Sequence, residues 1–364
     1  MADVNKHTPK TIGGRMSVVD DTEMQRLKKM GHYGSDGGNR GKVLLERQSI
    51  ISSTRKELLA DLTFSKGFAV TGFHSNSSGG KSVGYLTYDG LKASGNPDWK
   101  LAQWGCRKDI VSEHTFRREN GVMTYTDGGK YLRVNTDAVG CIELGIKGSV
   151  EYTLDSAGRP RERLKATENW PHILIEQAIE TKLSRDCRRL CMEIDYQVEE
   201  CNSLVDRRNY PVNPDMHAGQ FQWFLMLQDG DEHSKSYGQN MWFGFSMFDT
   251  RTMDGTPSGF QAYDGGKEDA TGFFIYMPSL KDLAKTEGNR VESIPTTVIG
   301  KRICIKVDIL PEIEKALKIV QGYGVMQGAN VGKMKVLSTN LGWELPGNYD
   351  VRAKIHYFNI YEEY

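Results

Sequence analysis

The sequence predicts a mainly β protein, a two-sheet antiparallel sandwich of the jelly-roll kind with one or two short helices. Short runs that are apolar, or that alternate apolar with polar residues, follow one another between turn clusters from Lys42 to the end of the chain. The 39 glycines among 364 residues suit the many tight turns that connect such strands. These two observations favour one large sandwich over a helical or α/β fold.

The composition excludes several classes of partner. Lys and Arg together number 47, as do Asp and Glu, so the formal charge is zero and nothing indicates a nucleic-acid partner. No run approaches the roughly 18 apolar residues of a membrane span. The start, MADVNKHTPK, lacks the apolar centre of a signal peptide. We expect a soluble protein with no membrane partner. Its compartment stays open, because a secreted chain can lose its signal, and so does its oligomeric state.

The chain divides into two parts. Residues 1–41 are polar and rich in glycine, with one short helical pattern in DDTEMQRLKKM, and we interpret them as an N-terminal arm or lid. Residues 42–364 carry the strand pattern without a low-complexity linker or an internal repeat. We expect them to form a single large β-sandwich domain.

The strands are predicted from their alternation. The clearest is RRLCMEIDYQVEE, in which Leu190, Met192 and Ile194 alternate with polar neighbours, so that one face is buried and the other is wet. The others are KVLLERQSII, GFAVTGF, VGYLTY, GVMTY, KYLRVNT, CIELGI, HILIEQAI, GQFQWFLMLQ, NMWFGFSMF, GFFIYM, KRICIKVDI and VRAKIHYFNIY. One helix is predicted after Pro311, in PEIEKALKIVQGYG, with an apolar stripe at Ile313, Ala316, Leu317 and Val320.

No motif indicates a cofactor. The six cysteines (Cys106, Cys141, Cys187, Cys191, Cys201 and Cys304) are too sparse for a disulfide framework and lack zinc-site spacing, so we expect free thiols and no metal. SNSSGGKSV lacks the first glycine and the helix of a phosphate loop. A structural calcium ion on the loops DGDEHSKSYGQN or DGGKEDATG stays an alternative to plain solvated loops.

Three predicted strands carry polar or aromatic residues on one face. His172 shares a face with Glu176, Gln220 shares one with Gln222, and Trp242 is followed on its own face only by a glycine and a serine. A sugar needs such a surface, because its C–H face stacks on an aromatic ring and its hydroxyls bond to amides. The alternative interpretation is an ordinary solvated sheet face.

The segments WPHILIEQ, QFQWFLMLQD, NMWFGFSMFDTR and GNYDVRAKIHYFNIYEEY, in the C-terminal half, resemble strands of concanavalin-like bacterial jelly rolls that bind or cleave polysaccharides. Resemblance to lyases of this kind implies that Gln220 or Gln222 neutralises a uronate carboxyl group and that His172 or Tyr263 moves the proton. Resemblance to retaining glycosidases implies two glutamates on one strand. The nearest candidates, Glu193, Asp195, Gln197 and Glu199, are more typical of a solvated convex surface.

The prediction for function is a carbohydrate-active protein that acts on a polysaccharide or oligosaccharide, as a polysaccharide lyase or a glycoside hydrolase, with its site on the concave sheet face. A non-catalytic carbohydrate-binding, adhesion or structural protein is the alternative. The predicted catalytic residues are His172, Glu176 and Tyr263, and the predicted substrate-binding residues are Gln220, Gln222, Trp242 and Arg251, the last of which can meet a carboxylate with its planar fork.

Overall fold

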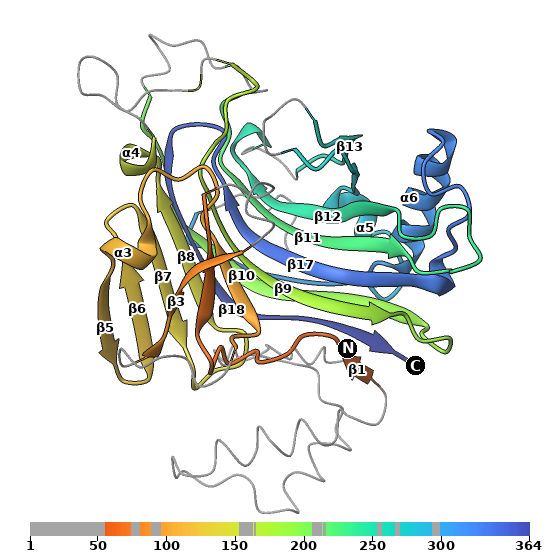
Figure 1. Cartoon of the computed structure of the whole chain (residues 1–364), viewed down its shortest axis with the longest axis horizontal. Helices are drawn as coiled ribbons and strands as arrows, with labels where there is room; N and C mark the ends of the chain where they lie inside the picture. Colours follow the sequence, from red (N-terminus) through yellow and green to blue (C-terminus); the bar gives the residue numbers. More distant parts are fainter. Residues whose placement is uncertain are drawn as a thin grey trace, which may run out of the picture. The chain divides into compact units, whose positions relative to one another are not determined.

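The computed structural model describes residues 55–73, 81–88, 96–152, 163, 165–205, 213, 216–252, 257–265, 270–292 and 299–364. The predicted arm (residues 1–41) and the predicted strand KVLLERQSII lie outside them. Within the described residues the fold is a sandwich of two large, mostly antiparallel sheets (Figure 1). The predicted fold class is confirmed.

The first sheet has the strand order β15 (Arg290–Val291), β16 (Arg302–Asp308), β10 (Arg189–Ser203), β18 (Tyr349–Glu363), β8 (Ile142–Lys147), β7 (Lys130–Asn135), β6 (Val122–Thr126) and β5 (Thr115–Glu119). The short strand β1 (Arg55–Glu57) also pairs with β18. Every pairing in this sheet is antiparallel.

The second sheet has the order β13 (Phe260–Tyr263), β14 (Phe274–Met277), β12 (Asn240–Asp249), β11 (Gln220–Asp229), β17 (Met334–Glu344), β9 (His172–Lys182), β4 (Trp99–Ala102), β2 (Phe68–Thr71) and β3 (Ser82–Leu86). Two of its pairs, β12 with β14 and β2 with β4, are parallel. Each predicted strand segment that falls within the described residues forms a strand, and β17 is a long central strand that was not predicted.

The helices are short except for one. Three have four residues each: α3 (Ile110–Glu113), α4 (Gly148–Glu151) and α5 (Leu280–Leu283). The predicted helix is confirmed as α6 (Leu310–Gly322), whose predicted apolar stripe is buried and which lies at one end of the sandwich (Figure 1). None of the helices in the described part of the chain has the length and apolar character needed to cross a bilayer.

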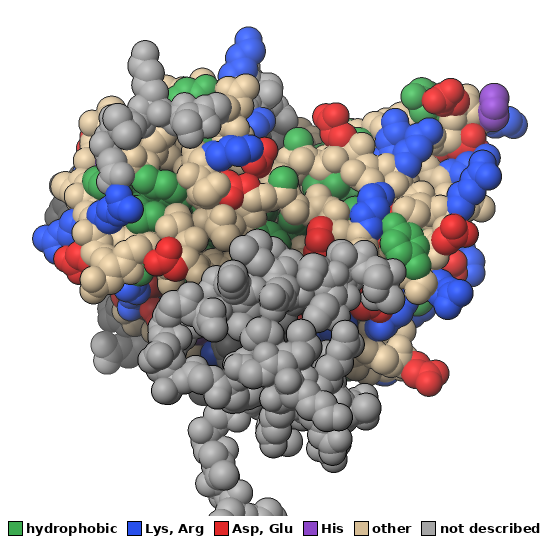
Figure 2. Space-filling view, turned by 90° about the horizontal axis from the view of Figure 1, so that it is seen from below, with side chains coloured by type: hydrophobic (Ala, Val, Ile, Leu, Met, Phe, Trp, Pro, Cys, Tyr) green, Lys and Arg blue, Asp and Glu red, His purple; other side chains and the backbone are tan. Residues whose placement is uncertain are grey.

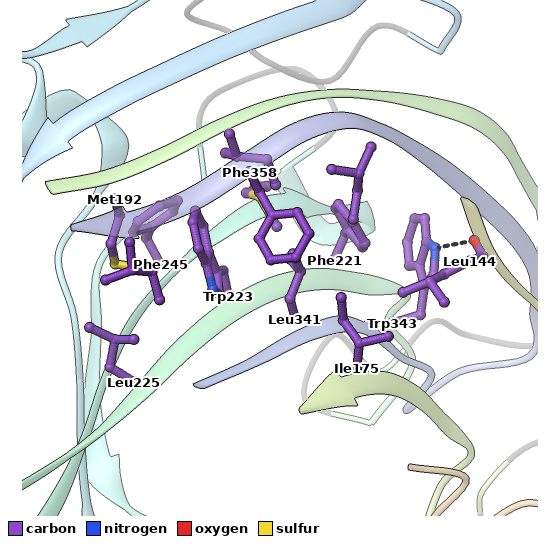
Figure 3. Close-up of a cluster of buried hydrophobic side chains, with 14 of the residues drawn as sticks. Leu144, Ile175, Met192, Phe221, Trp223, Leu225, Phe245, Leu341, Trp343 and Phe358 are labelled. Carbon is purple, nitrogen blue, oxygen red and sulfur yellow. Dashed lines mark hydrogen bonds between the residues drawn. The ribbon is translucent and has the colours of Figure 1, made fainter. Parts of the chain in front are cut away.

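The core lies between the inner faces of the two sheets (Figure 3). Phe221, Trp223 and Leu225 of β11 alternate inward, on the face opposite Gln220 and Gln222, and meet side chains such as Met192 and Phe358 from the first sheet. Buried tryptophans need a partner for their N–H group. The Nε1 of Trp343 therefore donates to the carbonyl oxygen of Leu144 in the opposite sheet, at 3.2 Å. This bond ties the two layers together.

One face of the molecule is of mixed charge. On the face shown in Figure 2, Lys and Arg side chains lie among Asp and Glu side chains.

All six cysteines are free in the structure. In the described residues no cluster of three or more His, Cys, Asp or Glu side chains could hold a metal ion. In the first loop considered for calcium, Asp229 accepts bonds from Ser236 and the backbone of Asp231, and Asp231 pairs with Lys333.

Candidate active site

The outer face of the second sheet, which points away from the core, carries a cavity of about 530 Å³. We call it the sheet pocket. Its floor comes from β9, β11, β12 and β17, and its walls come from β13, β14 and the loops before β9. The lining residues used below are Trp104, Arg163, Trp170, His172, Gln220, Gln222, Phe224, Trp242, Asp249, Arg251, Phe260, Tyr263, Asp264, Thr271, Ile275, Met277 and Glu344. A cavity of this size suits a small organic ligand or a few sugar units.

Strand register brings four polar side chains into one row across the floor. His172 of β9 is opposite Glu344 of β17, Glu344 is opposite Gln220 of β11, and Gln220 is opposite Asp249 of β12. We call these four residues the polar row. Directly opposite residues of neighbouring strands have side chains within contact distance. Residues far apart in the sequence therefore act together at one end of the sheet pocket.

His172 and Glu344 form one end of this row. The Nε2 of His172 lies 3.4 Å from Oε2 of Glu344, and its Nδ1 lies 2.7 Å from the carbonyl oxygen of Trp170. A carbonyl oxygen only accepts, so Nδ1 must carry a hydrogen and donate. In a neutral ring Nε2 would then be an acceptor facing a carboxylate, and the contact is favourable only when one proton lies between the two groups. The pair can hold a proton at the pocket floor and transfer it.

Two tryptophans enclose this pair. The ring of Trp170 stacks on His172 with centroids 5.8 Å apart, and Trp104 meets the same imidazole edge-on, also at 5.8 Å. The Nε1 of Trp170 donates to Oε2 of Glu344 at 3.3 Å. These contacts fix the orientation of both the imidazole and the carboxylate, as the chemistry of a proton-transfer pair requires.

Asp249 is held differently. Its Oδ1 accepts bonds from the backbone N and the Nε of Arg251, both at 2.9 Å. Its Oδ2 accepts from the Nη2 of Arg251 at 2.5 Å and from Nε2 of Gln220 at 3.1 Å. A carboxylate offers about four acceptor positions, and these bonds occupy them. Asp249 is therefore a partner for Arg251, with no position left for a reacting proton.

The other end of the sheet pocket is mainly apolar. Phe224, Trp242, Ile275 and Met277 line it, and the exposed ring of Phe260 forms part of its rim, with 51% of its surface accessible. Trp242 was expected to lie open because Gly244 follows it on the same face. Instead, the ring of Phe224 lies over Gly244, where an added Cβ would approach to 2.4 Å, and packs edge-on against Trp242.

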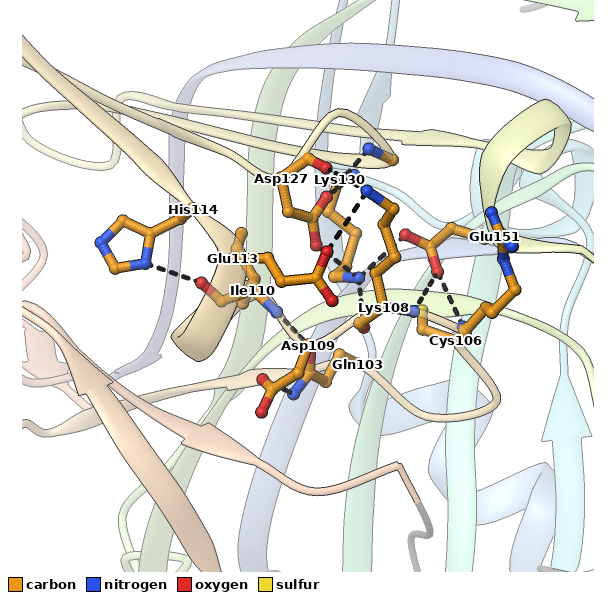
Figure 4. A network of polar contacts seen from close by, with 12 residues as sticks. Gln103, Cys106, Lys108, Asp109, Ile110, Glu113, His114, Asp127, Lys130 and Glu151 are labelled. Atoms are coloured by element: carbon orange, nitrogen blue, oxygen red, sulfur yellow. Dashed lines mark hydrogen bonds and ion pairs between the residues drawn. The ribbon is translucent and has the colours of Figure 1, made fainter.

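A buried ionic cluster, shown in Figure 4, contacts the backbone that follows Trp104. Lys130, at 1% exposure, places its Nζ 2.9 Å from Glu151, 2.8 Å from Asp127 and 2.7 Å from the carbonyl oxygen of Lys108. The other oxygen of Glu151 accepts the backbone N–H groups of Arg107 and Lys108. The cluster thus holds the segment after Trp104 in place.

Six of the seven predicted site residues, all except Glu176, line this one pocket. The ring of Tyr263 also packs edge-on against Phe274, a core residue, and against Tyr323. Glu176 shares the outer face with His172, as predicted, but lies two pleats along β9, opposite Asn340 and Lys100. The titratable partner of His172 is Glu344.

Glu176 titrates near neutrality for another reason. Burial raises its pKa from 4.5 to about 7, and the nearby Lys100 opposes this only in part. Because the folded pKa exceeds the unfolded one, the carboxyl contributes stability below about pH 4.5 that is lost as the pH rises to about 7.

We therefore expect Glu176→Gln to remove this pH dependence. The wild type should lose about 2 to 3 kcal/mol of unfolding free energy relative to the variant between pH 4.5 and pH 8. Urea unfolding of both proteins at the two pH values measures the difference. Parallel stability profiles would show that Glu176 ionises normally.

Sequence reasoning missed several pocket residues. Trp104, Arg163 and Trp170 lie on loops, where periodicity carries no information, and Glu344 lies on the unpredicted strand β17. The alternation of Leu341 and Trp343 with Gly342 and Glu344 is the signal that could have found it. Gly342 is needed there, because a Cβ would lie 2.2 Å from the carbonyl oxygen of Ile173.

No protein-family model matches the chain, and no curated protein matches it in sequence. Solved structures that match include the family 11 xylanase from Neocallimastix patriciarum, at 9% identity over 72% of this chain and 99% of that one, with a TM-score of 0.34. A family 12 xyloglucanase from Bacillus licheniformis matches at 10% identity over 69% and 97%, with a TM-score of 0.35.

A third match is the xyloglucanase domain of a type three effector from Sinorhizobium fredii, in complex with cellobiose. It has 10% identity and covers 69% of this chain and 96% of that one, with a TM-score of 0.34. All three TM-scores are low. The class of this chain, a two-sheet β-sandwich, therefore rests on its own strand order, and its function is argued from its own pocket.

Proposed function

We propose that the chain binds a glycan in the sheet pocket and hydrolyses a glycosidic bond there, with Glu344 giving and taking the proton. The approach of Nε2 of His172 to within 3.4 Å of Oε2 of Glu344 on the floor of the sheet pocket is the observation that carries this proposal. Protonation of the leaving oxygen is the step that a glycosidic bond needs most. The two tryptophans beside this pair offer ring edges and faces to a sugar.

The remaining floor suits hydroxyl recognition. Gln222 lies in the next row from Gln220, and both side chains line the pocket, so that amide groups face the same space as the aromatic rings. An amide both donates and accepts, as a sugar hydroxyl does. The solved xylanase and xyloglucanases named above act on polysaccharides by name, and a polysaccharide or oligosaccharide is the partner proposed for this chain.

Hydrolysis is favoured over elimination. A lyase must neutralise a uronate carboxylate before its α-proton can be removed. Of the residues predicted to meet that carboxylate, Gln220, Gln222 and Arg251, only Arg251 carries a positive charge. Arg251 is already paired with Asp249.

A panel of plant, algal and bacterial polysaccharides tests the reaction. We expect new reducing ends without the ultraviolet absorbance of unsaturated uronates. Reducing ends accompanied by that absorbance would establish a lyase, and binding without new reducing ends would establish a non-catalytic glycan-binding protein.

The rim aromatic should contribute to affinity without supporting the fold. We expect Phe260→Ala to weaken glycan binding by about 1 to 3 kcal/mol while leaving the melting temperature unchanged, because its ring is half exposed. Tyr85→Ala is the matched control, since Tyr85 is 52% exposed on β3 and does not line the pocket. Calorimetric titration measures the affinity. Equal losses in both variants would place the glycan elsewhere.

A further inference from the structure

The charged groups of the sheet pocket already have bonding partners within the protein. Among its described lining residues, the groups that carry or can take a positive charge are His172, Arg163 and Arg251, and the acidic ones are Glu344, Asp249 and Asp264. Which of these charges a ligand can meet depends on how each one is already bonded.

The two arginines are engaged in different ways. Arg163 is 3% exposed, donates to the carbonyl oxygens of Met216, Pro346, Lys165 and Ala166, and lies 4.4 Å over the ring of Trp170. Its charge is spread over backbone acceptors in the pocket wall. Arg251 has 37% of its side chain exposed and could reach a ligand, but its fork grips Asp249 through Nε and Nη2.

The other two acidic groups are bonded to residues other than an arginine. Glu344 faces His172, whereas Asp264 accepts bonds from the backbone N and the hydroxyl of Thr271, at 2.7 and 2.6 Å. Bringing a further carboxylate into this space would set it beside existing negative charge, at a cost that burial increases. An uncharged sugar meets no such cost.

We infer that Asp249 sets the charge selectivity of the sheet pocket: by neutralising Arg251 it admits uncharged glycans and excludes uronates. The inference rests on the proposed function, since it names the substrate class of the same site. Asp249 is the last residue of β12 and Arg251 lies two residues further on. Whether the guanidinium group of Arg251 can bind a ligand therefore depends on whether Asp249 holds it. Freed of its partner, Arg251 would present a planar pair of donors to a uronate carboxylate.

Asp249→Asn tests this directly, because the amide keeps the shape and the acceptor oxygen while removing the charge. The probes are sodium glucuronate, sodium galacturonate and a galacturonate tetrasaccharide, with xylotetraose and cellotetraose as neutral counterparts, titrated by calorimetry. We expect the wild type to bind neutral tetrasaccharides and to bind the uronates at least tenfold more weakly. The variant should gain at least tenfold in uronate affinity, and the gain should shrink as salt is raised.

Two controls isolate the cause. In the double variant Asp249→Asn/Arg251→Gln the gain should vanish. In Asp231→Asn, which frees Lys333 outside the pocket, no gain should occur. A variant that gains no uronate affinity, or a wild type that already prefers uronates, overturns the inference. A wild type that binds none of the neutral glycans of the panel contradicts the proposed function instead, and a gain in Asp249→Asn would still support the role of Asp249.

Discussion

Replacing Glu344 with glutamine should lower the rate of glycan cleavage by about 10²- to 10⁴-fold, the usual contribution of a positioned acid or base. The amide keeps the size of the carboxyl group and still meets Trp170, so glycan affinity should change little. Unlike a carboxyl group, it cannot give up and take back a proton beside His172. Reducing-end assays at saturating glycan, together with calorimetric titration, separate the two effects.

The matched control is Glu119→Gln, an exposed strand glutamate on β5 in the other sheet. It should leave both rate and affinity unchanged. If Glu344→Gln keeps wild-type turnover, the proton comes from another group. If it loses binding and turnover together, Glu344 holds the glycan without acting as its acid.

Replacing Lys130 with methionine should destabilise the fold by about 3 to 5 kcal/mol. Lys130 is the cation between two fully buried carboxylates, Asp127 and Glu151, and its removal leaves both without a counter-charge. Because Glu151 also holds the backbone after Trp104, tryptophan fluorescence should change before global unfolding. Urea unfolding followed by circular dichroism and by fluorescence measures both effects.

Lys333→Met is the surface counterpart. Lys333 pairs with Asp231 and has 57% of its side chain exposed, so its loss should cost at most about 1 kcal/mol. A triple variant with Asp127→Asn and Glu151→Gln added to Lys130→Met should recover part of the lost stability, because no buried charge remains. Equal costs for Lys130→Met and Lys333→Met would show that the buried cluster does not contribute as its geometry implies.

Much of the fold could be predicted because the core-facing residues alternate without interruption. In β11, β12 and β9 the apolar residues that alternate with the polar face, such as Trp223, Phe243 and Ile175, are buried in the core. Strand β17 was not predicted from the sequence because it contains a β-bulge between Val336 and Ser338. The bulge shifts the phase, so that the inward residues Val336 and Thr339 are three apart and the simple alternation fails.

The site was predicted in part for the same reason. Strand alternation placed His172, Gln220 and Trp242 on one face, but which residues meet across strands depends on register, and register is set by long-range pairing. Glu176 was therefore paired with His172 along the strand, while the structure pairs His172 with Glu344 across it. Likewise, no local sequence pattern shows that the side chain of Arg251 donates to the carboxylate of Asp249, two residues earlier in the chain.

The positions of β17 and β18 have a consequence for biosynthesis. β17 joins β9 to β11 in the second sheet, and β18 joins β10 to β8 in the first, yet both strands come last along the chain. The N-terminal part of a polypeptide leaves the ribosome first. The strands β8, β9, β10 and β11 therefore emerge before β17 and β18, and the edges that later pair with these two strands have no partner until then. Exposed strand edges invite pairing with other chains. We expect the nascent chain to need chaperone protection until Met334 and the residues after it have left the exit tunnel.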